Sequence, residues 1–545
     1  MPFEGELRPF QQRARDQILE WGRGIVGVTM GGGKTPIAIA ITEELLDREE
    51  VECGLIIAPS SLKYQWRGKP GTKNPGGLAQ FAPGANVVVI DGNADQRREL
   101  YMHAMGWAEY IILGYPQVID DWKFVKKLPA GFIVLDEIQA IKNPGSQRSQ
   151  KIEKLLFPAR KRGKMILGLT GQLLENKPED VFHVCAGVDP HVLGHPEVFD
   201  MTFVVRDKYG KPTRYVNPLL LKKRLHENIL VRVSRDEIEE YLPNRTHEQF
   251  LVPFDESTRK LYRTVVTDLH EELSQVSSAR AFDLVAHYSG AKTSAAEAAQ
   301  RGRVMSRLTC ARMLCDDPRL LLYSADLYNA TASGELGAVK AGSAYAYELR
   351  ERGLLDGIPR GRGVKMREVV DEVRTILSED PANKVVVFST FKPVLFWLQA
   401  ALKRYSKVVV YHGGVTAKRR DELKVQFNND DATRVFLSSD AGGAGVDLPA
   451  GNYLINYNLP FSAGLVEQRN ARIDRMSSEH TNTMVLDFFM EGSVEEFYAE
   501  IVAARARLAR AAIDGAGRGR GGVSLPTTSL RGFLEDWLEA NPVIG

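Results

Sequence analysis

Cysteine is scarce in this chain, and long apolar runs are missing. Only 4 of its 545 residues are cysteine. No two of them form a Cys-x-x-Cys pair, which argues against a disulfide framework and a thiolate zinc site and fits a reducing cytosol. No apolar run approaches the about 20 residues that a membrane-spanning helix needs. The first residues, MPFEGELRPFQQ, lack the basic and apolar regions of a signal peptide. We therefore expect a cytoplasmic protein with no membrane partner.

A strong net charge is also absent. Lys plus Arg number 71 against 69 Asp plus Glu, a formal net charge of +2. Total charge therefore does not indicate a nucleic-acid partner, and any basic surface has to be local. The length predicts roughly three or four domains, enough for large buried cores.

Short apolar runs separated by helical stretches form two sets. The first third of the chain holds six, at 25–30, 54–59, 86–91, 110–115, 132–137 and 165–171; the last third holds five, at 384–390, 407–414, 434–439, 453–459 and 484–489. β-rich runs between helices indicate βαβ units and a buried parallel sheet. The sequence thus predicts an α/β protein with two parallel-sheet lobes. The region between them is mostly helical in pattern, with an apolar stripe at helical spacing in 256–276.

A glycine-rich turn follows the first apolar run and precedes a helical pattern. It reads Gly31, Gly32, Gly33, Lys34, Thr35. Glycines let backbone N–H groups curl around phosphate, the lysine reaches the outer phosphates, and the threonine can ligate Mg²⁺. Val28 stands where the usual P-loop pattern has its first glycine, so the prediction rests on the strand–loop–helix context. The alternative is a glycine-rich turn with an incidental lysine.

Two further groups complete the parts of a P-loop NTPase. The apolar run at 132–137 ends in Asp136, which can hold Mg²⁺ through water, and Glu137, which can polarise the attacking water. Arg472 and Arg475 lie three residues apart and are expected on one face of a helix. Arginines delivered from a second lobe would stabilise transition-state charge on the γ-phosphate. The alternative is a solvated basic helix face.

An ordered series of motifs resembles the superfamily-two helicase-like ATPases and, within them, the Snf-type double-stranded-DNA translocases. The segments are LRPFQ (7–11), APSSLKYQW (58–66), DEIQAIKNPGSQRS (136–149), LTGQLLENKPED (169–180), LPNRT (242–246), LTCARMLCDDP (308–318), FSTF (388–391), YHGGVTAKRRDELKVQFN (411–428), SSDAGGAGVDL (438–448) and EQRNARIDR (467–475). The resemblance implies two RecA-like lobes with helical insertions, ATP and Mg²⁺ as cofactors, and double-stranded DNA, branched or forked forms included, as the partner. It implies DNA-dependent ATP hydrolysis by a monomer in a bacterial or viral-host cytosol, associated with the nucleoid.

The resemblance also assigns residues. The catalytic set is Lys34, Asp136, Glu137, Gln139, Gln468, Arg472 and Arg475. The nucleotide set is Gln11 as adenine reader, Gly31, Gly32, Gly33, Lys34, Thr35, Gly445 and Asp447, with Thr35 and Asp136 as the Mg²⁺ ligands. The DNA set is Ser60, Ser61, Lys63, Ser389, Thr390 and Lys392.

The chain departs from the family pattern in its third motif. Gln172 and Leu173 stand where the family usually carries Thr-Pro. In the family this motif links the state of the bound nucleotide to the grip on DNA, so we expect weaker coupling between the two. The length leaves no room for the chromatin-reading domains of large remodellers, so we expect a bare motor. The expected domains are lobe 1 (1–178), its helical insertion (179–241), a linker and helical insertion of lobe 2 (242–365), lobe 2 (366–505), and a basic Gly/Arg linker with a C-terminal helix (506–545).

Other clusters leave alternatives open. The tail arginines Arg505, Arg507, Arg510, Arg518 and Arg520 are candidates for extra DNA affinity, and Arg301, Arg303, Arg307 and Arg312 are expected to be a solvated helix face. His183, Cys185, His191 and His195 match no usual zinc spacing. An apolar stripe at 530–538 favours packing against lobe 2 over partner docking. A strand-separating helicase and a weakly catalytic DNA-binding scaffold remain alternative functions.

Overall fold

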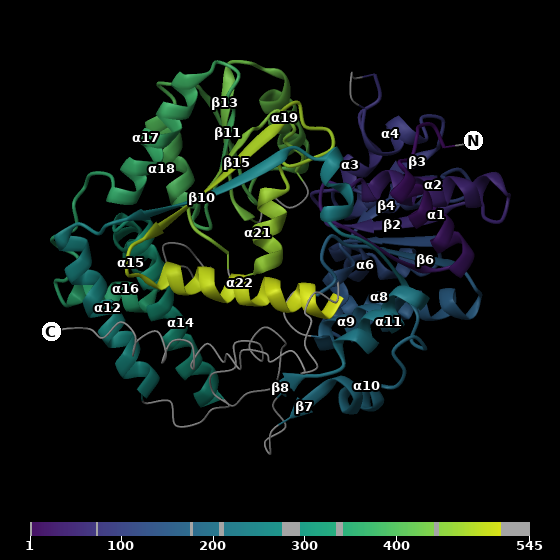
Figure 1. The fold of residues 1–545 in the computed structure, drawn as a ribbon, viewed down its shortest axis with the longest axis horizontal. Helices are drawn as coiled ribbons and strands as arrows, with labels where there is room; N and C mark the ends of the chain where they lie inside the picture. The colour runs from purple at the N-terminus through teal and green to yellow at the C-terminus, as the bar shows by residue number, and fades with distance from the viewer. Residues whose placement is uncertain are drawn as a thin grey trace.

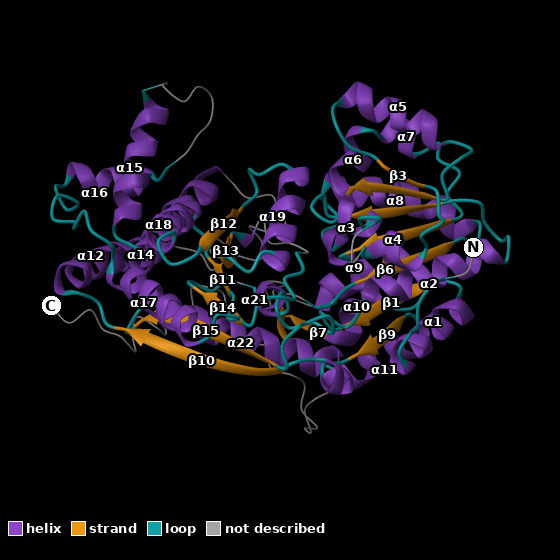
Figure 2. Ribbon diagram, turned by 90° about the horizontal axis from the view of Figure 1, so that it is seen from above, coloured by secondary structure: helices purple, strands orange, loops and turns teal. Residues whose placement is uncertain are grey.

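The computed structural model describes residues 3–71, 75–174, 178–206, 212–274, 295–333, 342–440, 446–460 and 462–513. These residues form two α/β lobes side by side, each built on one parallel sheet with helices on both faces (Figures 1 and 2).

Lobe 1 holds a seven-stranded sheet in the order β3-β4-β2-β5-β6-β1-β9. All neighbouring strands in it are parallel. The strands are β1 (Gly24–Val28), β2 (Gly54–Ala58), β3 (Val87–Val89), β4 (Tyr110–Gly114), β5 (Phe132–Asp136), β6 (Met165–Leu169) and β9 (Leu230–Val233). The helices are α1 (Pro9–Trp21), α2 (Lys34–Asp47), α3 (Lys63–Arg67), α4 (Gly77–Phe81), α5 (Ala94–Ala104), α6 (Tyr115–Asp120), α7 (Trp122–Val125), α8 (Gln147–Lys161), α9 (Pro178–Val188), α10 (Pro196–Phe203) and α11 (Pro218–Asn228).

Burial on both faces explains why the strands of lobe 1 are continuous apolar runs. Successive side chains of a strand point to opposite faces. In β2, Leu55 and Ile57 pack in one core while Ile56 and Ala58 pack in the other. A short antiparallel pair, β7 (Val204–Arg206) and β8 (Pro212–Tyr215), and two 3₁₀ turns, η1 (Ile138–Ile141) and η2 (Asp236–Tyr241), complete the lobe.

Lobe 2 holds a six-stranded parallel sheet in the order β10-β15-β14-β11-β13-β12. The strands are β10 (Asn244–Val252), β11 (Val385–Phe388), β12 (Lys407–Tyr411), β13 (Thr433–Ser438), β14 (Tyr453–Asn456) and β15 (Asn482–Met490). The helices are α12 (Glu256–Ser274), α14 (Ala295–Asp316), α15 (Arg319–Ala332), α16 (Ala344–Glu351), α17 (Val364–Glu379), α18 (Lys392–Leu402), α19 (Ala417–Asn429), α21 (Ala463–Asn470) and α22 (Val494–Ile513).

All eleven apolar runs become strands, and the two-lobe fold is confirmed. The segment 179–241 is not only helical, because its β9 is an edge strand of the lobe 1 sheet. The segment 242–365 likewise begins with β10, which pairs over nine residues with β15 of lobe 2. The expected boundary at 505 falls inside α22, and the apolar stripe at 530–538 lies outside the described residues.

α22 joins the two lobes. It starts beside the lobe 2 sheet and crosses to α11 of lobe 1 (Figure 1). Ile513 is buried in a lobe 1 core, and its carbonyl oxygen lies 3.0 Å from Nε2 of His226 on α11. The lobes are therefore held together at a point distant from the P-loop.

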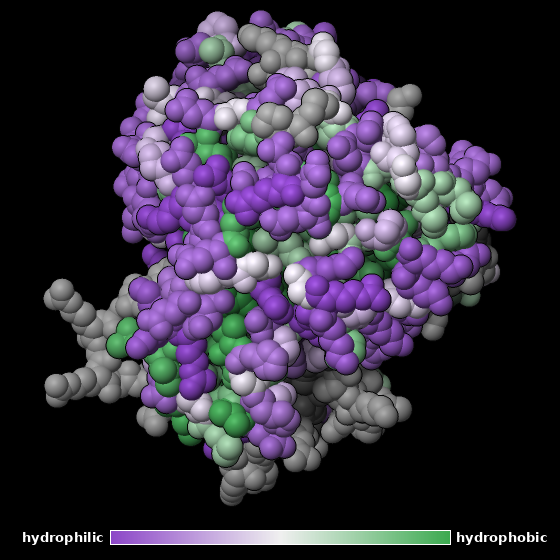
Figure 3. All heavy atoms as spheres, turned by 90° about the vertical axis from the view of Figure 1, so that its right-hand side faces the viewer, coloured by the Kyte–Doolittle hydropathy of each residue, from purple (hydrophilic) through white to green (hydrophobic). Residues whose placement is uncertain are grey.

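The surface on the lobe 1 side is mainly hydrophilic, with small groups of apolar side chains between polar ones (Figure 3). No helix among the described residues is long and apolar enough to cross a membrane.

Candidate active site

The phosphate-binding turn lies between β1 and α2, and its glycines are required by close contacts. Gly31 has φ +82° and Gly33 has φ +77°, both in the left-handed region that favours glycine. A Cβ on Gly31 would lie 2.6 Å from the carbonyl oxygen of Asp474 in lobe 2. A Cβ on Gly33 would lie 2.4 Å from Nε2 of Gln11. The turn is thus pressed between the helix that carries Gln11 and the second lobe.

Gln11 is buried on α1, and its Nε2 donates to the carbonyl oxygen of Gly32 at 3.3 Å. The predicted adenine reader therefore lies directly against the turn. α2 begins at Lys34, so its first backbone N–H groups and the side chain of Thr35 lie at the turn. A helix N-terminus of this kind favours phosphate.

Opposite charges surround Lys34. Burial lowers the pKa of its ammonium, while the charges of Glu137 and Asp136 raise it and those of Arg475 and Arg472 lower it. Groups that lie hundreds of residues apart in the sequence therefore act on one lysine. This is the grouping that the sequence predicted for a nucleotide held between two lobes.

Asp136 ends β5 and is buried. Its Oδ2 accepts from Nε1 of Trp66 at 2.9 Å, and its Oδ1 accepts from the backbone N–H of Glu137 at 3.0 Å. Burial, and next the charge of Glu137, raises the pKa of Asp136 to about 6. A divalent cation would relieve this repulsion, so the carboxylate pair together with the hydroxyl of Thr35 fits Mg²⁺.

Glu137 has an unusual backbone conformation. Its φ of +50° lies in the left-handed region, which costs energy for a residue with a side chain. Nε2 of Gln139 donates to its Oε2 at 2.6 Å, which fixes one carboxylate oxygen and leaves the other for a water molecule.

The third motif extends this network towards lobe 2. The hydroxyl of Thr170 donates to Oε1 of Gln139 at 2.9 Å, and the backbone N–H of Gln172 donates to the Thr170 hydroxyl at 3.0 Å. A Cβ on Gly464, in the first turn of α21, would lie 2.7 Å from Oε1 of Gln172. Gln172 therefore packs on lobe 2, and a chain of contacts runs from Glu137 to α21.

The two arginines follow α21 rather than lie on it, because the helix ends at Asn470. This corrects the expectation of a shared helix face. Arg472 is buried and donates to the carbonyl oxygen of Val446 at 3.4 Å; burial, and next the charge of Arg475, lowers its pKa to about 10. Arg475 pairs with Asp447, its Nη2 lying 2.6 Å from Oδ1.

Contacts between the lobes hold these groups at the P-loop. Oδ2 of Asp447 accepts from Nε2 of Gln65 in lobe 1 at 2.7 Å. Arg235, which follows β9 of lobe 1, pairs with the buried Asp474. A Cβ on Gly31 would lie 3.4 Å from Cα of Arg475. The sequence motifs contain Asp447 and Asp474 but do not identify Gln65 and Arg235 as their partners in lobe 1.

Two predicted residues of the nucleotide and catalytic sets remain, Gln468 and Gly445. Gln468 is half-buried on α21, close in sequence to the arginines. Gly445 lies outside the described residues. Cys185 is buried on α9, and no group of three or more His, Cys, Asp or Glu within the described ranges could hold a metal ion.

The DNA candidates follow the carboxyl ends of β2 and β11. Ser60, Thr390 and Lys392 are exposed there, and Ser61 is half-buried. Lys63 is only 2% exposed; its Nζ donates to the carbonyl oxygen of Ile90 at 2.7 Å and to Asp91 at 3.0 Å. Ser389 is fully buried. Both expectations of a surface role are thus corrected, because these two side chains hold their loops from inside.

Residues 16–320 match the SNF2-related domain, and residues 365–477 match the helicase conserved C-terminal domain. The first match covers more than half of the chain, which carries its candidate nucleotide site between two helicase-type lobes. The chain belongs to the SNF2-related family.

Curated relatives of the chain are named as ATP-dependent helicases. An uncharacterized ATP-dependent helicase of Mycoplasma genitalium is 22% identical over 486 residues, which cover 88% of this chain and 39% of the relative. The ATP-dependent helicase fft3 of Schizosaccharomyces pombe is 24% identical over 529 residues, which cover 89% of this chain and 54% of the relative. The chain therefore spans about half the length, or less, of these curated relatives.

A solved structure, the SWI2/SNF2 ATPase core of Sulfolobus solfataricus in complex with dsDNA, is 20% identical, with 94% of each chain covered and a TM-score of 0.39. The fold of this chain is defined by its own sheet topology.

Proposed function

We propose that this chain is a DNA-dependent ATP hydrolase that moves along duplex DNA, remodelling DNA structures or displacing bound proteins. One observation carries the proposal: the P-loop glycine Gly31 of lobe 1 and the segment Asp474–Arg475 of lobe 2 lie in contact. A site completed only by lobe closure links each hydrolysis event to a motion between the lobes.

The residues divide the work of hydrolysis. The P-loop N–H groups and Lys34 hold the phosphates, and Gln11 lies where it can contact the base. Glu137 takes a proton from water as that water attacks the γ-phosphorus and the bond to the β–γ bridging oxygen breaks. Thr35 and Asp136 would hold Mg²⁺, which when bound would supply positive charge next to the phosphates.

Arg475 is paired with Asp447. For Arg475 to stabilise the transition state it exchanges this carboxylate for the γ-phosphate, since both are anionic acceptors that a guanidinium binds in similar geometry. ATP binding thereby releases Asp447, whose other oxygen accepts from Gln65 of lobe 1. The exchange would couple nucleotide binding to the contacts between the lobes.

Exposed hydroxyls and an amine on both lobes favour phosphate contacts with DNA. Ser60 follows β2, and Thr390 and Lys392 follow β11, where they can bind the backbone without reading sequence. We propose that the protein acts as a cytoplasmic monomer and that branched or forked DNA is among its partners.

The test is an ATPase assay with duplex, single-stranded, forked and Holliday-junction DNA. We expect Mg²⁺-dependent hydrolysis that duplex DNA stimulates. Lys34→Ala should impair nucleotide binding, and Glu137→Gln should retain ATP binding but stall chemistry. Hydrolysis by Glu137→Gln at the wild-type rate would contradict the assignment of Glu137 as the general base. Tight DNA binding by the wild-type protein without turnover would favour the scaffold.

A second assay separates translocation from strand separation. A translocase should displace a triplex-forming strand from duplex DNA in an ATP-dependent way and leave a plain fork largely paired. Efficient unwinding of forks without triplex displacement would favour the helicase.

A further inference from the structure

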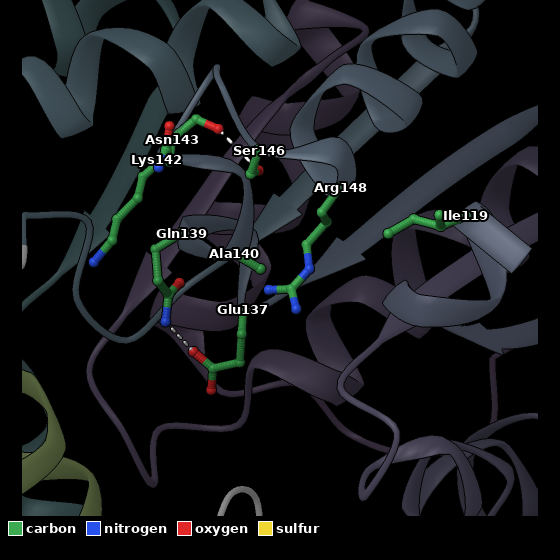
Figure 4. Close-up of a pocket in the computed structure, with 8 residues that line it drawn as sticks. All are labelled: Ile119, Glu137, Gln139, Ala140, Lys142, Asn143, Ser146 and Arg148. Carbon is green, nitrogen blue, oxygen red and sulfur yellow. Dashed lines mark hydrogen bonds between the residues drawn. The ribbon is translucent and has the colours of Figure 1, made fainter. Parts of the chain in front are cut away.

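A cavity of about 510 Å³ opens beside Glu137, on the side away from the P-loop. It lies between α6 and the loop that joins β5 to α8, and its polar lining comes from Glu137, Gln139, Lys142, Asn143, Ser146 and Arg148 (Figure 4). Glu137 thus borders both the candidate active site and this cavity. No catalytic role assigned above uses the residues beyond Gln139.

The charge of the cavity suits an oxyanion. Among the described lining residues, Glu137 is acidic and Lys142 and Arg148 are basic. Arg148 is exposed, and its guanidinium carbon lies 5.5 Å from the ring centroid of Tyr115. In Figure 4 its guanidinium points into the space in front of Glu137.

Helix α8 adds a second, independent feature. It is 15 residues long, and its N-terminus, capped by Ser146, lies at the cavity with Arg148 in its first turn. The Ser146 hydroxyl accepts from the backbone N–H of Ser149, which leaves the earlier N–H groups of the helix for an anion. Cavity, guanidinium and helix N-terminus therefore converge on one space.

The opposite side of the active site is closed by lobe 2. Asp474 lies against Gly31, Asp447 binds Gln65, and Asp474 pairs with Arg235. After hydrolysis ADP would still occupy the P-loop, so orthophosphate formed against Glu137 meets protein in that direction. The cavity is open to solvent, and its two cations attract the product that the Glu137 carboxylate repels.

We propose that this cavity is a binding site for a phosphate group, through which the orthophosphate product leaves after hydrolysis. The inference rests on the proposed ATPase function. Arg148 attracts the leaving anion and Lys142 contributes to the same field, and neither residue takes part in the chemical step.

The test compares Arg148→Ala with two matched variants. Arg148→Lys keeps the positive charge, and Lys154→Ala removes an exposed cation of α8 that does not line the cavity. In a single turnover, chemical cleavage is followed by acid quench and phosphate release by a fluorescent phosphate sensor. Inhibition of steady-state turnover by added inorganic phosphate is measured alongside.

Arg148→Ala should leave the cleavage rate within about twofold and should delay phosphate release. It should raise the inhibition constant of inorganic phosphate about tenfold, as expected when one charged hydrogen bond is lost. Arg148→Lys and Lys154→Ala should each stay within about threefold of the wild type. Unchanged phosphate release and inhibition in Arg148→Ala would overturn the proposal.

A DNA-binding measurement distinguishes orthophosphate from the phosphates of the DNA backbone as the ligand of the cavity. Duplex affinity and its salt dependence should be unchanged in Arg148→Ala, because the assigned ligand is orthophosphate. A weaker, less salt-dependent DNA complex with unaltered phosphate inhibition would instead assign the cavity to the DNA backbone and overturn the exit role.

Failure of the proposed ATPase function would give a different result, namely a wild-type protein that cleaves no ATP. Calorimetric titration with inorganic phosphate needs no turnover, so loss of phosphate binding in Arg148→Ala still supports the site, and equal binding by both proteins still refutes it.

Discussion

Removing the side chain of Gln139 should slow hydrolysis without weakening ATP binding. Gln139 is 8% exposed, donates to Oε2 of Glu137 at 2.6 Å and accepts from the Thr170 hydroxyl at 2.9 Å. Within the described ranges its side-chain hydrogen bonds go to Glu137 and Thr170 and not to the P-loop, so its effect reaches the reaction through Glu137. In Gln139→Ala the carboxylate loses the donor that fixes its orientation, while Asp136 keeps its hydrogen bond from Trp66.

The size of the effect follows from that hydrogen bond. A bond to a charged group contributes about 1.5–3 kcal/mol, which corresponds to about a 10- to 100-fold loss of kcat. KM for ATP should stay within about threefold, since groups that bind the nucleotide are untouched. Steady-state ATPase assays with saturating duplex DNA measure both constants, and circular dichroism controls for folding.

Thr170→Val provides the matched control. It removes the donor to Gln139 and the acceptor of the Gln172 N–H but leaves the bond from Gln139 to Glu137, so its loss of kcat should be smaller, about 3- to 10-fold for neutral hydrogen bonds. Wild-type kcat in Gln139→Ala would refute the positioning role. So would a larger loss in Thr170→Val, because the effect would then not pass through Glu137.

Three further outcomes are expected. Arg475→Ala should reduce kcat by about 10³-fold or more, as for other arginine fingers, with ATP binding retained by filter assay. Arg367→Ala, which removes an exposed arginine of α17, should be neutral, and equal activity of the two variants would contradict the catalytic role of Arg475. The pKa of Asp136 is raised to about 6, so folding favours its protonated form; the stability from this group is fully present below the unfolded pKa near 4 and is lost as pH rises through about 6. Mg²⁺ binds the ionised carboxylate, so it should raise Tm more at pH 7.5 than at pH 5. An equal shift in Tm at the two pH values would contradict the assignment of Asp136 as a metal ligand. Lys365→Met should destabilise lobe 2 by about 3–5 kcal/mol in urea unfolding, because the buried carboxylate of Glu495, 2.6 Å from the lysine Nζ, would lose its partner. The double variant with Glu495→Leu should recover much of this loss. No recovery would contradict the stabilising role of the Lys365–Glu495 pair.

Central strands were predictable because burial on both faces demands continuous apolar runs. β2 and β5 are buried at every position, and the sequence shows this directly. The edge strands carry no such signal. β9 is only four residues long, and β10 exposes most of NRTHEQFLV, so neither has the run or the strict alternation that marks a strand. Their identity comes from pairing with distant strands.

The nucleotide motifs were predictable because phosphate chemistry fixes residue types at fixed spacing. Burial of Lys63 was not, since a lysine next to serines in a loop is usually solvated. Its Nζ is held by the carbonyl of Ile90 and by Asp91, partners that only the fold brings near. The role of Gln172 was equally hidden. Its departure from Thr-Pro suggested weak coupling, whereas its amide reaches Gly464 of the opposite lobe.

β10 gives the second lobe two attachments of different kinds. The chain leaves lobe 1 at Leu242 and crosses the full width of lobe 2 as β10, paired residue for residue with β15; from the far end of β15, α22 returns to lobe 1 and anchors at Ile513. Lobe 2 is thus connected to lobe 1 at two separate places, by the segment that enters β10 and by α22 (Figure 1). Two separate connections to lobe 1 restrain sliding and twisting of lobe 2 more than a single linker would.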